Sequence, residues 1–467
     1  MLIRSFFTAG LFINSYLIFD EETRHAAVVD PTRQIEIYLT QALQDKVEIT
    51  DIIETHVHAD FVSGAAELKA ALGGKPLIHC SGLGGEEWIP SYADHIVQNR
   101  ETINLGSLRL EALHTPGHTP EHLIWVVYDE KRSANVPELA FTGDLLFVGS
   151  VGRPDLLGEE SREELAKQLY RSLFAVLYAL PDFLEIYPSH GGGSLCGKGI
   201  AMKLTTTLGY EKKCNPWLIP QDYRRWVDSL ELSSLPVPDY FARMKQENLK
   251  RRDEAGNKEL PPVLAIEQAR KSLISDFVAD LRRPDDFAVG NIKGSINIPV
   301  TPAFPLWAGS FLPADRDIVL IMDNLEAIPS VIQSLRLVGI DRISGVIDVS
   351  HWKIGDRAEL FEPSPAMDVA TLQAEGENVY LLDVRNDQEW DLGHIEGAHH
   401  LDMHKVRQSL DAIPLDKPIA VICHSGNRAS IIASLLERET GANVFNVKGG
   451  MQAWNKAKLP LTQPSPS

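Results

Sequence analysis

The chain has 467 residues, more than one ordinary hydrophobic core accommodates, so we expect two to four domains. Apolar residues make up 44% of the sequence and charged residues 23%, the profile of a soluble globular protein, and the net charge of -19 argues against nucleic-acid binding, which requires clustered Lys and Arg. The four cysteines are too few and too scattered for a disulfide framework, which predicts a reduced, cytoplasmic protein.

The apolar run Met1–Phe19 resembles a signal peptide only superficially, because Asn14 and Ser15 interrupt it and no small-residue cleavage pattern follows. A second run, His25–Val29, comes after a short break, and the two runs predict a β-hairpin. No apolar run is long enough to span a membrane. The rest of residues 1–245 alternates strand and helix patterns with Gly-rich breaks, which predicts a layered α/β fold.

A dense group of metal-seeking side chains follows the predicted buried strand Ile49–Ile53. The sequence Glu-Thr-His-Val-His-Ala-Asp-Phe at 54–61 contains two imidazoles and a carboxylate, which are costly to bury unless a cation lies among them. Further candidate ligands stand at other strand-to-loop junctions, the usual place for active sites in such folds. They are His118 in Thr-Pro-Gly-His-Thr, Asp144 in Thr-Gly-Asp and His190 in Pro-Ser-His-Gly.

These four motifs, in this order, resemble the metallo-β-lactamase superfamily over about the first 200 residues. Any one of them is weak evidence, because a lone histidine at a strand end is most often a hydrogen-bonded core residue. Their joint occurrence is very specific. The resemblance implies an αββα sandwich that carries a metal.

Phe61 bears on which branch of the superfamily the chain resembles. Dinuclear zinc hydrolases such as glyoxalase II hold their second metal with a histidine at this position. The remaining set suits one metal on His56, His118 and Asp144, a facial triad that leaves positions on Fe(II) open for substrate and O2. This arrangement resembles the persulfide dioxygenases and implies one Fe(II) per chain. The side chains then expected to orient ligands or water are His58, Asp60 and His190.

The same branch has a Gly-Arg-[Thr/Pro]-Asp element, which residues 152–155 match. Arg153 could anchor a carboxylate of the thiol carrier, or it could form a structural ion pair. Cys196 follows His190 in a Gly-rich loop, where it could bind or carry sulfur or be a passive thiol. We interpret the remaining two cysteines of this region as structural.

A charged stretch at 245–259 indicates a linker or a solvated helix end. Beyond it, two stretches that begin near Phe277 and Leu381 share a pattern with a period of about 103 residues, which predicts two copies of a small α/β domain. The domains expected from these patterns are 1–250, 258–360 and 365–467.

A second reactive group lies where the predicted strand Ile419–Ile422 meets a helical run. The connecting sequence is Cys-His-Ser-Gly-Asn-Arg at 423–428. Cys423 there faces backbone N–H groups and the positive end of the helix, and Arg428 adds a positive charge, so both favour the thiolate. A merely buried cysteine would need neither Gly426 nor Arg428 in the following turn, so we favour a nucleophile.

The surrounding motifs, Asp-Val-Arg, Gly-His-Ile and a late Gly-Gly, resemble a rhodanese domain. Four residues separate Cys423 from Arg428, as in sulfurtransferases, whereas the phosphatases of this fold have one more. A persulfide on Cys423, formed by attack on a sulfane sulfur, is the expected intermediate. In the first copy Met322 or Asp323 stands at the nucleophile position and no cradle arginine follows, so this copy resembles an inactive rhodanese domain.

The whole chain therefore resembles persulfide dioxygenase–rhodanese fusion proteins. The resemblance implies a metallo-β-lactamase αββα sandwich followed by two rhodanese-like α/β domains, with oxidation of a thiol persulfide to sulfite coupled to sulfane-sulfur transfer in sulfide detoxification. The expected partners are glutathione, coenzyme A or a similar thiol, O2, sulfite and thiosulfate, and a second copy of the chain, with no nucleic acid and no membrane.

The main alternative is a zinc-dependent thioester hydrolase of the glyoxalase II type with accessory rhodanese domains. A non-enzymatic sulfur carrier is a further alternative, against which the two intact reactive groups argue. The carrier thiol and the direction of sulfur transfer stay open.

Overall fold

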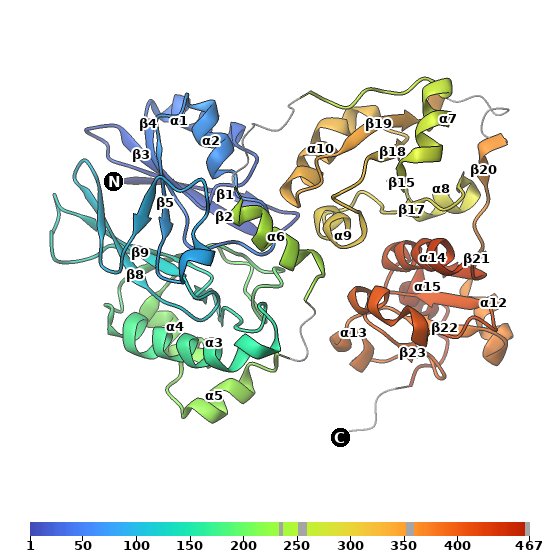
Figure 1. Ribbon diagram of the computed structural model, residues 1–467. Helices are drawn as coiled ribbons and strands as arrows, with labels where there is room; N and C mark the ends of the chain where they lie inside the picture. Colours follow the sequence, from blue (N-terminus) through green and yellow to red (C-terminus); the bar gives the residue numbers. More distant parts are fainter. Residues whose placement is uncertain (233–236, 251–258, 352–358, 463–467) are drawn as a thin grey trace. The chain divides into compact units, whose positions relative to one another are not determined.

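The computed structural model describes residues 1–232, 237–250, 259–351 and 359–462 (Figure 1). The chain forms two compact units: an N-terminal unit of Met1–Lys258 with Gln333–Gly339, and a C-terminal unit of Glu259–Ile332 with Ile340–Ser467. The predicted charged linker overlaps the end of helix α6 (Tyr240–Leu249), and its central residues, 251–258, lie outside the described residues. The three predicted domain boundaries stay a prediction.

The first sheet of the N-terminal unit has the strand order β1-β2-β3-β4-β5-β6. The strands are Leu2–Thr8, Ile13–Phe19, His25–Val29, Glu48–Ile53, Leu77–Ser81 and His95–Val97. The predicted hairpin is confirmed, because β2 and β3 pair antiparallel, with Tyr16 opposite Val29. From β3 onward neighbouring strands are parallel. Helices α1 (Glu36–Asp45) and α2 (Ala65–Ala71) contribute to an apolar cluster on one face of this sheet.

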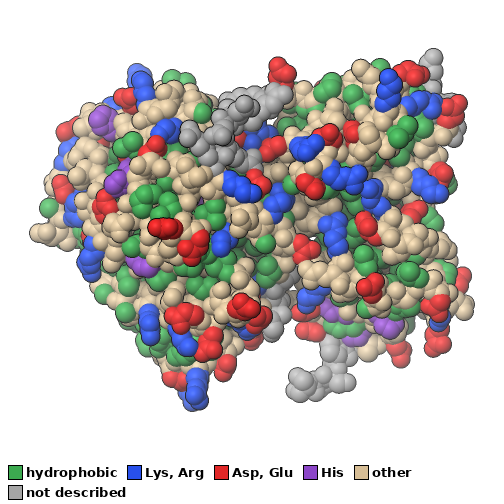
Figure 2. Space-filling view, in the orientation of Figure 1, with side chains coloured by type: hydrophobic (Ala, Val, Ile, Leu, Met, Phe, Trp, Pro, Cys, Tyr) green, Lys and Arg blue, Asp and Glu red, His purple; other side chains and the backbone are tan. Residues whose placement is uncertain are grey.

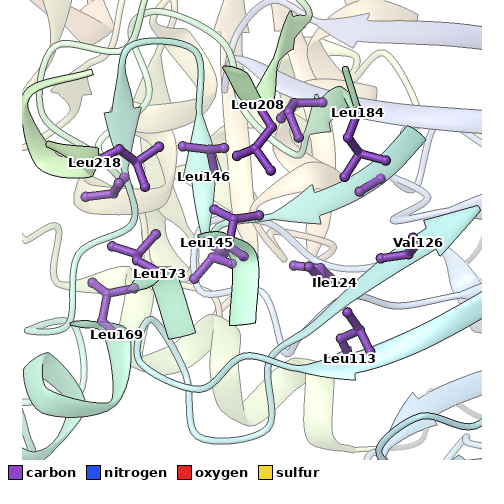
Figure 3. Packing of buried hydrophobic residues seen from close by; sticks show 14 of the residues in the cluster. Leu113, Ile124, Val126, Leu145, Leu146, Leu169, Leu173, Leu184, Leu208 and Leu218 are labelled. Carbon is purple, nitrogen blue, oxygen red and sulfur yellow. The ribbon is translucent and has the colours of Figure 1, made fainter. Parts of the chain in front are cut away.

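The second sheet has the order β14-β13-β10-β9-β8-β7. From β7 to β10 the strands are Thr102–Leu105, Leu108–His114, Leu123–Asp129 and Leu139–Gly143, and β13 and β14 are Glu185–Pro188 and Thr206–Thr207. The helices that pack on its outer face are α3 (Glu159–Arg171), α4 (Leu208–Cys214) and α5 (Tyr223–Ser229). Figure 3 shows leucines of this apolar cluster, among them Leu169 of α3, Leu208 of α4 and Leu113 of β8.

The two sheets pack face to face over a shared apolar core. Tyr16, Ile18 and Val29 from the first sheet meet Leu110, Trp125 and Phe141 from the second. Burying such a side chain stabilises the fold by about 2 kcal/mol each. Helices therefore cover both outer faces of a two-sheet sandwich, which is the αββα order expected from the sequence.

The C-terminal unit contains two parallel sheets, one from each predicted copy. The first has the order β17-β15-β18-β19, with strands Ile296–Asn297, Phe277–Asp280, Ile318–Met322 and Ile343–Asp348. Its helices are α7 (Ile266–Ser275), α8 (Pro284–Val289), α9 (Phe304–Phe311) and α10 (Ile328–Leu337). Strands β16 (Asn291–Ile292) and β20 (Phe361–Glu362) form a separate pair.

The second sheet of this unit has the order β21-β25-β24-β22-β23. In that order the strands are Ala366–Met367, Val444–Val447, Ile419–Ile422, Tyr380–Asp383 and His399–His400. Its helices are α12 (Val369–Glu375), α13 (Asp387–Asp391), α14 (Asn427–Thr440) and α15 (Gly450–Lys456).

Strand register makes the two copies equivalent residue by residue. Asp280 pairs with Ile321 in the first copy and Asp383 with Ile422 in the second. The next residue along the strand is therefore Met322 in one copy and Cys423 in the other. The structure resolves the alternative left by the sequence: Met322, not Asp323, stands at the nucleophile position, and a thioether cannot carry a persulfide.

Acidic and basic side chains are interspersed over the face of the molecule seen in Figure 2. Among the described residues, no helix combines the length and the apolar character that a membrane crossing requires.

Candidate metal centre and thiol cradle

His56, His118 and Asp144 come together although each follows a different strand. Their candidate ligand atoms all lie within 4.8 Å of one another, and all three side chains are buried. Oδ2 of Asp144 is 3.3 Å from Nε2 of His118 and 3.7 Å from Nε2 of His56. The three residues stand at the ends of β4, β8 and β10, where the chain leaves the two facing sheets.

Hydrogen bonds fix which nitrogen each imidazole presents to this centre. Nδ1 of His118 is 2.9 Å from the main-chain oxygen of Arg153, which can only accept, so the proton is on Nδ1 and the Nε2 lone pair is free. Nδ1 of His56 is 2.9 Å from the hydroxyl of Thr55, which itself donates to Asp30. His56 therefore also donates from Nδ1 and presents Nε2.

Charge and burial suit a divalent cation at this point. Burial lowers the pKa of His56 well below its usual value and lowers that of His118, so both are neutral, as metal ligands must be. Burial alone would raise the pKa of Asp144, but the charge and hydrogen bond of His190 hold it well below its usual range. Oδ2 of Asp144 lacks a hydrogen-bond partner among the described residues. An orphaned carboxylate oxygen facing two imidazole lone pairs fits a metal ion.

Asp60, His190 and Cys196 form a second buried group. His190 bridges two carboxylates, with Nε2 at 2.8 Å from Asp60 and Nδ1 at 2.7 Å from Asp144. Burial opposes its charge, but these two carboxylates raise the pKa of His190 to about 10. Burial and the nearby Asp144 raise the pKa of the Cys196 thiol well above its usual value. His190 thus holds Asp144 in place, and Cys196 stands beside it as a neutral thiol.

His58 faces a different set of carboxylates. Its Nε2 is 3.3 Å from Asp30 and 3.4 Å from Glu54, and these two carboxylates raise its pKa well above the usual value despite burial. The ring of Phe61 packs against His58, with centroids 4.3 Å apart, and is fully buried. The expectation that His58 orients ligands or water without joining the triad stays a prediction. In the structure His58 lies beside Asp30 and Glu54.

The sequence interpretation missed His122, which lies immediately before β9 and contacts the centre. Its Nε2 accepts a hydrogen bond from the backbone N–H of Asp144 at 3.0 Å, and its Nδ1 lies 2.9 Å from the hydroxyl of Thr115. Burial lowers the pKa of His122 to about 3, so it stays neutral. In the sequence, the position of His122 four residues after His118 could have indicated that it lies near the centre.

Arg153 is buried in an ion pair. Its guanidinium donates to both oxygens of Asp155, at 2.7 and 2.6 Å, and to the main-chain oxygen of Leu195. This matches the structural ion pair weighed from the sequence, while binding of a substrate carboxylate by Arg153 stays a prediction.

A cavity of about 1050 Å³ lies beside the centre. Its lining includes Ala59, between His58 and Asp60, and Pro120, two residues after His118. The lining also includes Trp88, Phe241 and Lys245, and the Lys245 ammonium lies 3.5 Å from the centroid of the Trp88 ring. A cavity of this size accommodates a small organic molecule.

The C-terminal unit holds Cys423 in a cradle of N–H groups. Its Sγ accepts from the backbone N–H of Gly426 at 3.1 Å and of Ala429 at 3.3 Å, at the start of α14. Gly426 has φ of 99°, in the left-handed region, which lets the loop turn back over the sulfur. Gly450 must also lack a side chain, because a Cβ there would lie 2.2 Å from the main-chain oxygen of Cys423.

Glu389 is a second residue that the sequence interpretation missed. Its two carboxylate oxygens accept from the guanidinium of Arg428 at 2.7 and 2.6 Å, and it also accepts from the N–H of Asn386 as part of a capping box on α13. The Arg428 charge beside the cradle is therefore held in one orientation. The signal was a glutamate three residues after the Ncap asparagine.

Two family patterns match the chain: the metallo-β-lactamase superfamily at residues 8–190 and the rhodanese-like domain at residues 366–457. A probable hydroxyacylglutathione hydrolase of Schizosaccharomyces pombe is 34% identical over 38% of this chain and 62% of its own length. The human mitochondrial persulfide dioxygenase ETHE1 is 30% identical over 41% of this chain and 68% of its own length. The chain thus spans less than two thirds of the first of these relatives.

Among solved structures, a metallo-β-lactamase from Staphylococcus aureus subsp. aureus COL is 33% identical with a TM-score of 0.66. The match covers 74% of this chain and 98% of the other. The fold is therefore shared well beyond the segment that carries the candidate metal ligands.

Proposed function

Because the chain belongs to the metallo-β-lactamase superfamily and carries a rhodanese-like domain near its C-terminal end, we propose that it oxidises a low-molecular-weight thiol persulfide at a single iron and transfers sulfane sulfur at Cys423. The overall oxidation is R–S–SH + O2 + H2O → R–SH + SO3²⁻ + 2 H⁺. The S–S bond breaks, O2 is the oxidant and the terminal sulfur is oxidised to sulfite. The physiological role we infer is sulfide detoxification.

One observation carries this proposal: His56, His118 and Asp144 offer a complete donor triad, while Phe61, which has no donor atom, stands where dinuclear zinc hydrolases have a histidine. Two neutral imidazoles and one carboxylate are the donor set of non-haem Fe(II) oxygenases. A bound Fe(II) would supply open coordination positions and redox chemistry toward O2.

The protein's own residues prepare this centre. The Arg153 main-chain oxygen and the Thr55 hydroxyl orient the two imidazoles, and His190 and the backbone contact with His122 orient Asp144. Because these groups are buried, water is excluded, and charges interact more strongly there than they do in bulk water. The adjoining cavity is the proposed binding site of the carrier thiol.

At the second site, sulfite accepts the outer sulfur of a Cys423 persulfide: Cys–S–S⁻ + SO3²⁻ → Cys–S⁻ + S2O3²⁻. The S–S bond to Cys423 breaks, a new S–S bond forms in thiosulfate, and the leaving thiolate returns to the N–H groups of Gly426 and Ala429. The reverse reaction would load Cys423 from thiosulfate and deliver a persulfide for oxidation. Either direction links the two activities.

A zinc-dependent thioester hydrolase is the second candidate function. Relatives named as hydroxyacylglutathione hydrolases match at similar identity. The group Asp60, His190 and Cys196 also offers three donors at the second position, where the thiol would take the place of the absent histidine. Two zinc ions per chain would be the signature of this alternative.

Metal analysis combined with oxygen uptake on the purified chain tests the proposal. We expect one iron per chain, O2 consumption with glutathione persulfide or coenzyme A persulfide, and a sulfite yield equal to the O2 consumed. Two zinc ions, hydrolysis of S-lactoylglutathione and no O2 uptake would overturn the dioxygenase in favour of the hydrolase.

A further inference from the structure

The inactive rhodanese-like copy contacts the first turns of α14 in the active copy through hydrogen bonds of the buried residue Asn297. Its amide nitrogen donates to the main-chain oxygens of Asp280 at 3.0 Å and Arg282 at 2.9 Å, which fixes the side chain at the end of β15. Its amide oxygen accepts from the hydroxyl of Ser430 at 2.6 Å, and its backbone N–H donates to the hydroxyl of Ser434 at 3.0 Å. Asn297, Ser430 and Ser434 are all nearly inaccessible to solvent.

Ser430 belongs to the turn of α14 that forms the sulfur cradle. Its backbone N–H donates to the main-chain oxygen of Gly426 at 3.0 Å. The residue before it, Ala429, supplies one of the two N–H groups that contact Sγ of Cys423, and Gly426 supplies the other. The hydrogen bond from Ser430 to Asn297 therefore restrains the same helical turn that sets both donors.

Asn297 occupies the position that His400 has in the active copy. Asp280 pairs with Asn297 in one copy, and Asp383 pairs with His400 in the other. His400 lies 2.8 Å from the main-chain oxygen of Arg385, and the amide of Asn297 makes the same kind of bond to Arg282. An amide carries an acceptor beside its donors, so Asn297 keeps this internal bond and can also accept from α14.

We propose that Asn297 of the inactive copy is a positioning residue for sulfur transfer at Cys423, acting through Ser430 and Ser434 on the first turns of α14. The proposal rests on the sulfurtransferase function assigned to Cys423. This gives the inactive copy a role that needs no nucleophile. The end of its sheet, at Asn297, holds the helix that forms the sulfur cradle of the active copy.

The test compares Asn297→Ala, Ser430→Ala and the double variant with Arg438→Ala in the full-length chain. Arg438 is the matched control, since its guanidinium contacts the main-chain oxygen of Gly294 and lies 4.3 Å from the ring centroid of Phe277. It touches the same inactive copy from the far end of α14, about 12 Å from Ser430 along the helix.

Two readouts separate positioning from stability. The first is the pH profile of iodoacetamide labelling at Cys423, followed by peptide mass spectrometry, which separates it from labelling of the exposed Cys214. The second is the split between kcat and KM for thiosulfate and a thiol acceptor. Loss of one buried hydrogen bond is worth about 1 kcal/mol, so we expect labelling at pH 7 and kcat to fall about fivefold, with KM nearly unchanged. The double variant should match either single variant, because both break the same bond.

Arg438→Ala should lower the thermal midpoint while leaving labelling and kcat at wild-type levels. Wild-type labelling and kcat in Asn297→Ala and Ser430→Ala, or losses that follow the thermal midpoint equally in all variants, would overturn the proposal. A third outcome is that the wild-type chain has no sulfurtransferase activity but the labelling of Cys423 still shifts in the variants. That outcome would refute the assigned function and support the positioning of Cys423 by Asn297.

Discussion

Nδ1 of His118 donates a hydrogen bond to the main-chain oxygen of Arg153 at 2.9 Å, while the guanidinium of the same arginine is locked onto Asp155. One residue thus fixes the tautomer of a candidate metal ligand and the loop on which that contact depends. At the candidate metal centre, the residue that orients His118 is thus itself held by hydrogen bonds.

Replacing His118 by Ala removes one of three ligands, so metal affinity and O2 uptake should be lost together. We expect iron content to fall at least tenfold by elemental analysis, in line with the cost of disturbing a metal site. His95→Ala is the control, since His95 pairs with Glu101 away from the centre and should leave iron content unchanged. Full O2 uptake by His118→Ala would show that the triad is wrongly assigned.

Cys423→Ser should abolish sulfur transfer and leave O2 uptake with glutathione persulfide intact, because a hydroxyl cannot form a persulfide. The measurements are thiosulfate-dependent sulfur transfer and oxygen-electrode traces on the same sample. Cys214→Ser, at an exposed cysteine, should retain both activities. Simultaneous loss of O2 uptake in Cys423→Ser would mean that the two sites do not act separately.

Glu389→Gln should free the guanidinium of Arg428 for anionic substrates. The carboxylate now competes with an incoming sulfite or thiosulfate for this charge, so we expect KM for thiosulfate to fall severalfold. The pair is partly solvated, so stability should change by less than about 1 kcal/mol. Steady-state kinetics at constant ionic strength give the answer, and a raised KM would show that Glu389 orients Arg428 productively instead of competing with substrate.

Glu121 makes the stability of the N-terminal unit depend on pH. Burial raises the pKa of this carboxyl to about 7, although it accepts a 2.7 Å hydrogen bond from the N–H of Val57. Because the folded state holds its proton more tightly than the unfolded state, the associated stability is complete below about pH 4.5 and is lost as the pH rises through about 7. The total is on the order of 3 kcal/mol.

Glu121→Gln keeps the acceptor for Val57 and removes the charge. Urea unfolding of the N-terminal unit should show a gain in stability over wild type at pH 8 that disappears at pH 4.5. Comparing the two proteins at each pH cancels the titration of all other groups. An equal difference at both pH values would contradict the raised pKa of Glu121.

Local sequence patterns were sufficient to predict much of the fold and many of the candidate site residues. Alternation and turn residues predicted the β2–β3 hairpin and the layered α/β architecture, since both depend on short-range chemistry. The motifs around His56, His118 and Asp144 identified candidate ligands, because a ligand's element type and its place at a strand end are visible in sequence. The spacing of Cys423, Gly426 and Arg428 likewise predicted a cradle, which depends on a single strand-to-helix turn.

Tertiary structure decided what each side chain faces. The pairing of His58 with Asp30, the support that His122 gives Asp144, and the pairing of Glu389 with Arg428 all join segments that are far apart in the sequence. Strand register showed that Met322 occupies the position equivalent to Cys423, and packing of the two copies brought Asn297 into hydrogen-bond contact with Ser430. Sequence specifies which groups can ionise, coordinate or donate, but their distances and burial, which determine charge and reactivity, arise only when distant strands pack together.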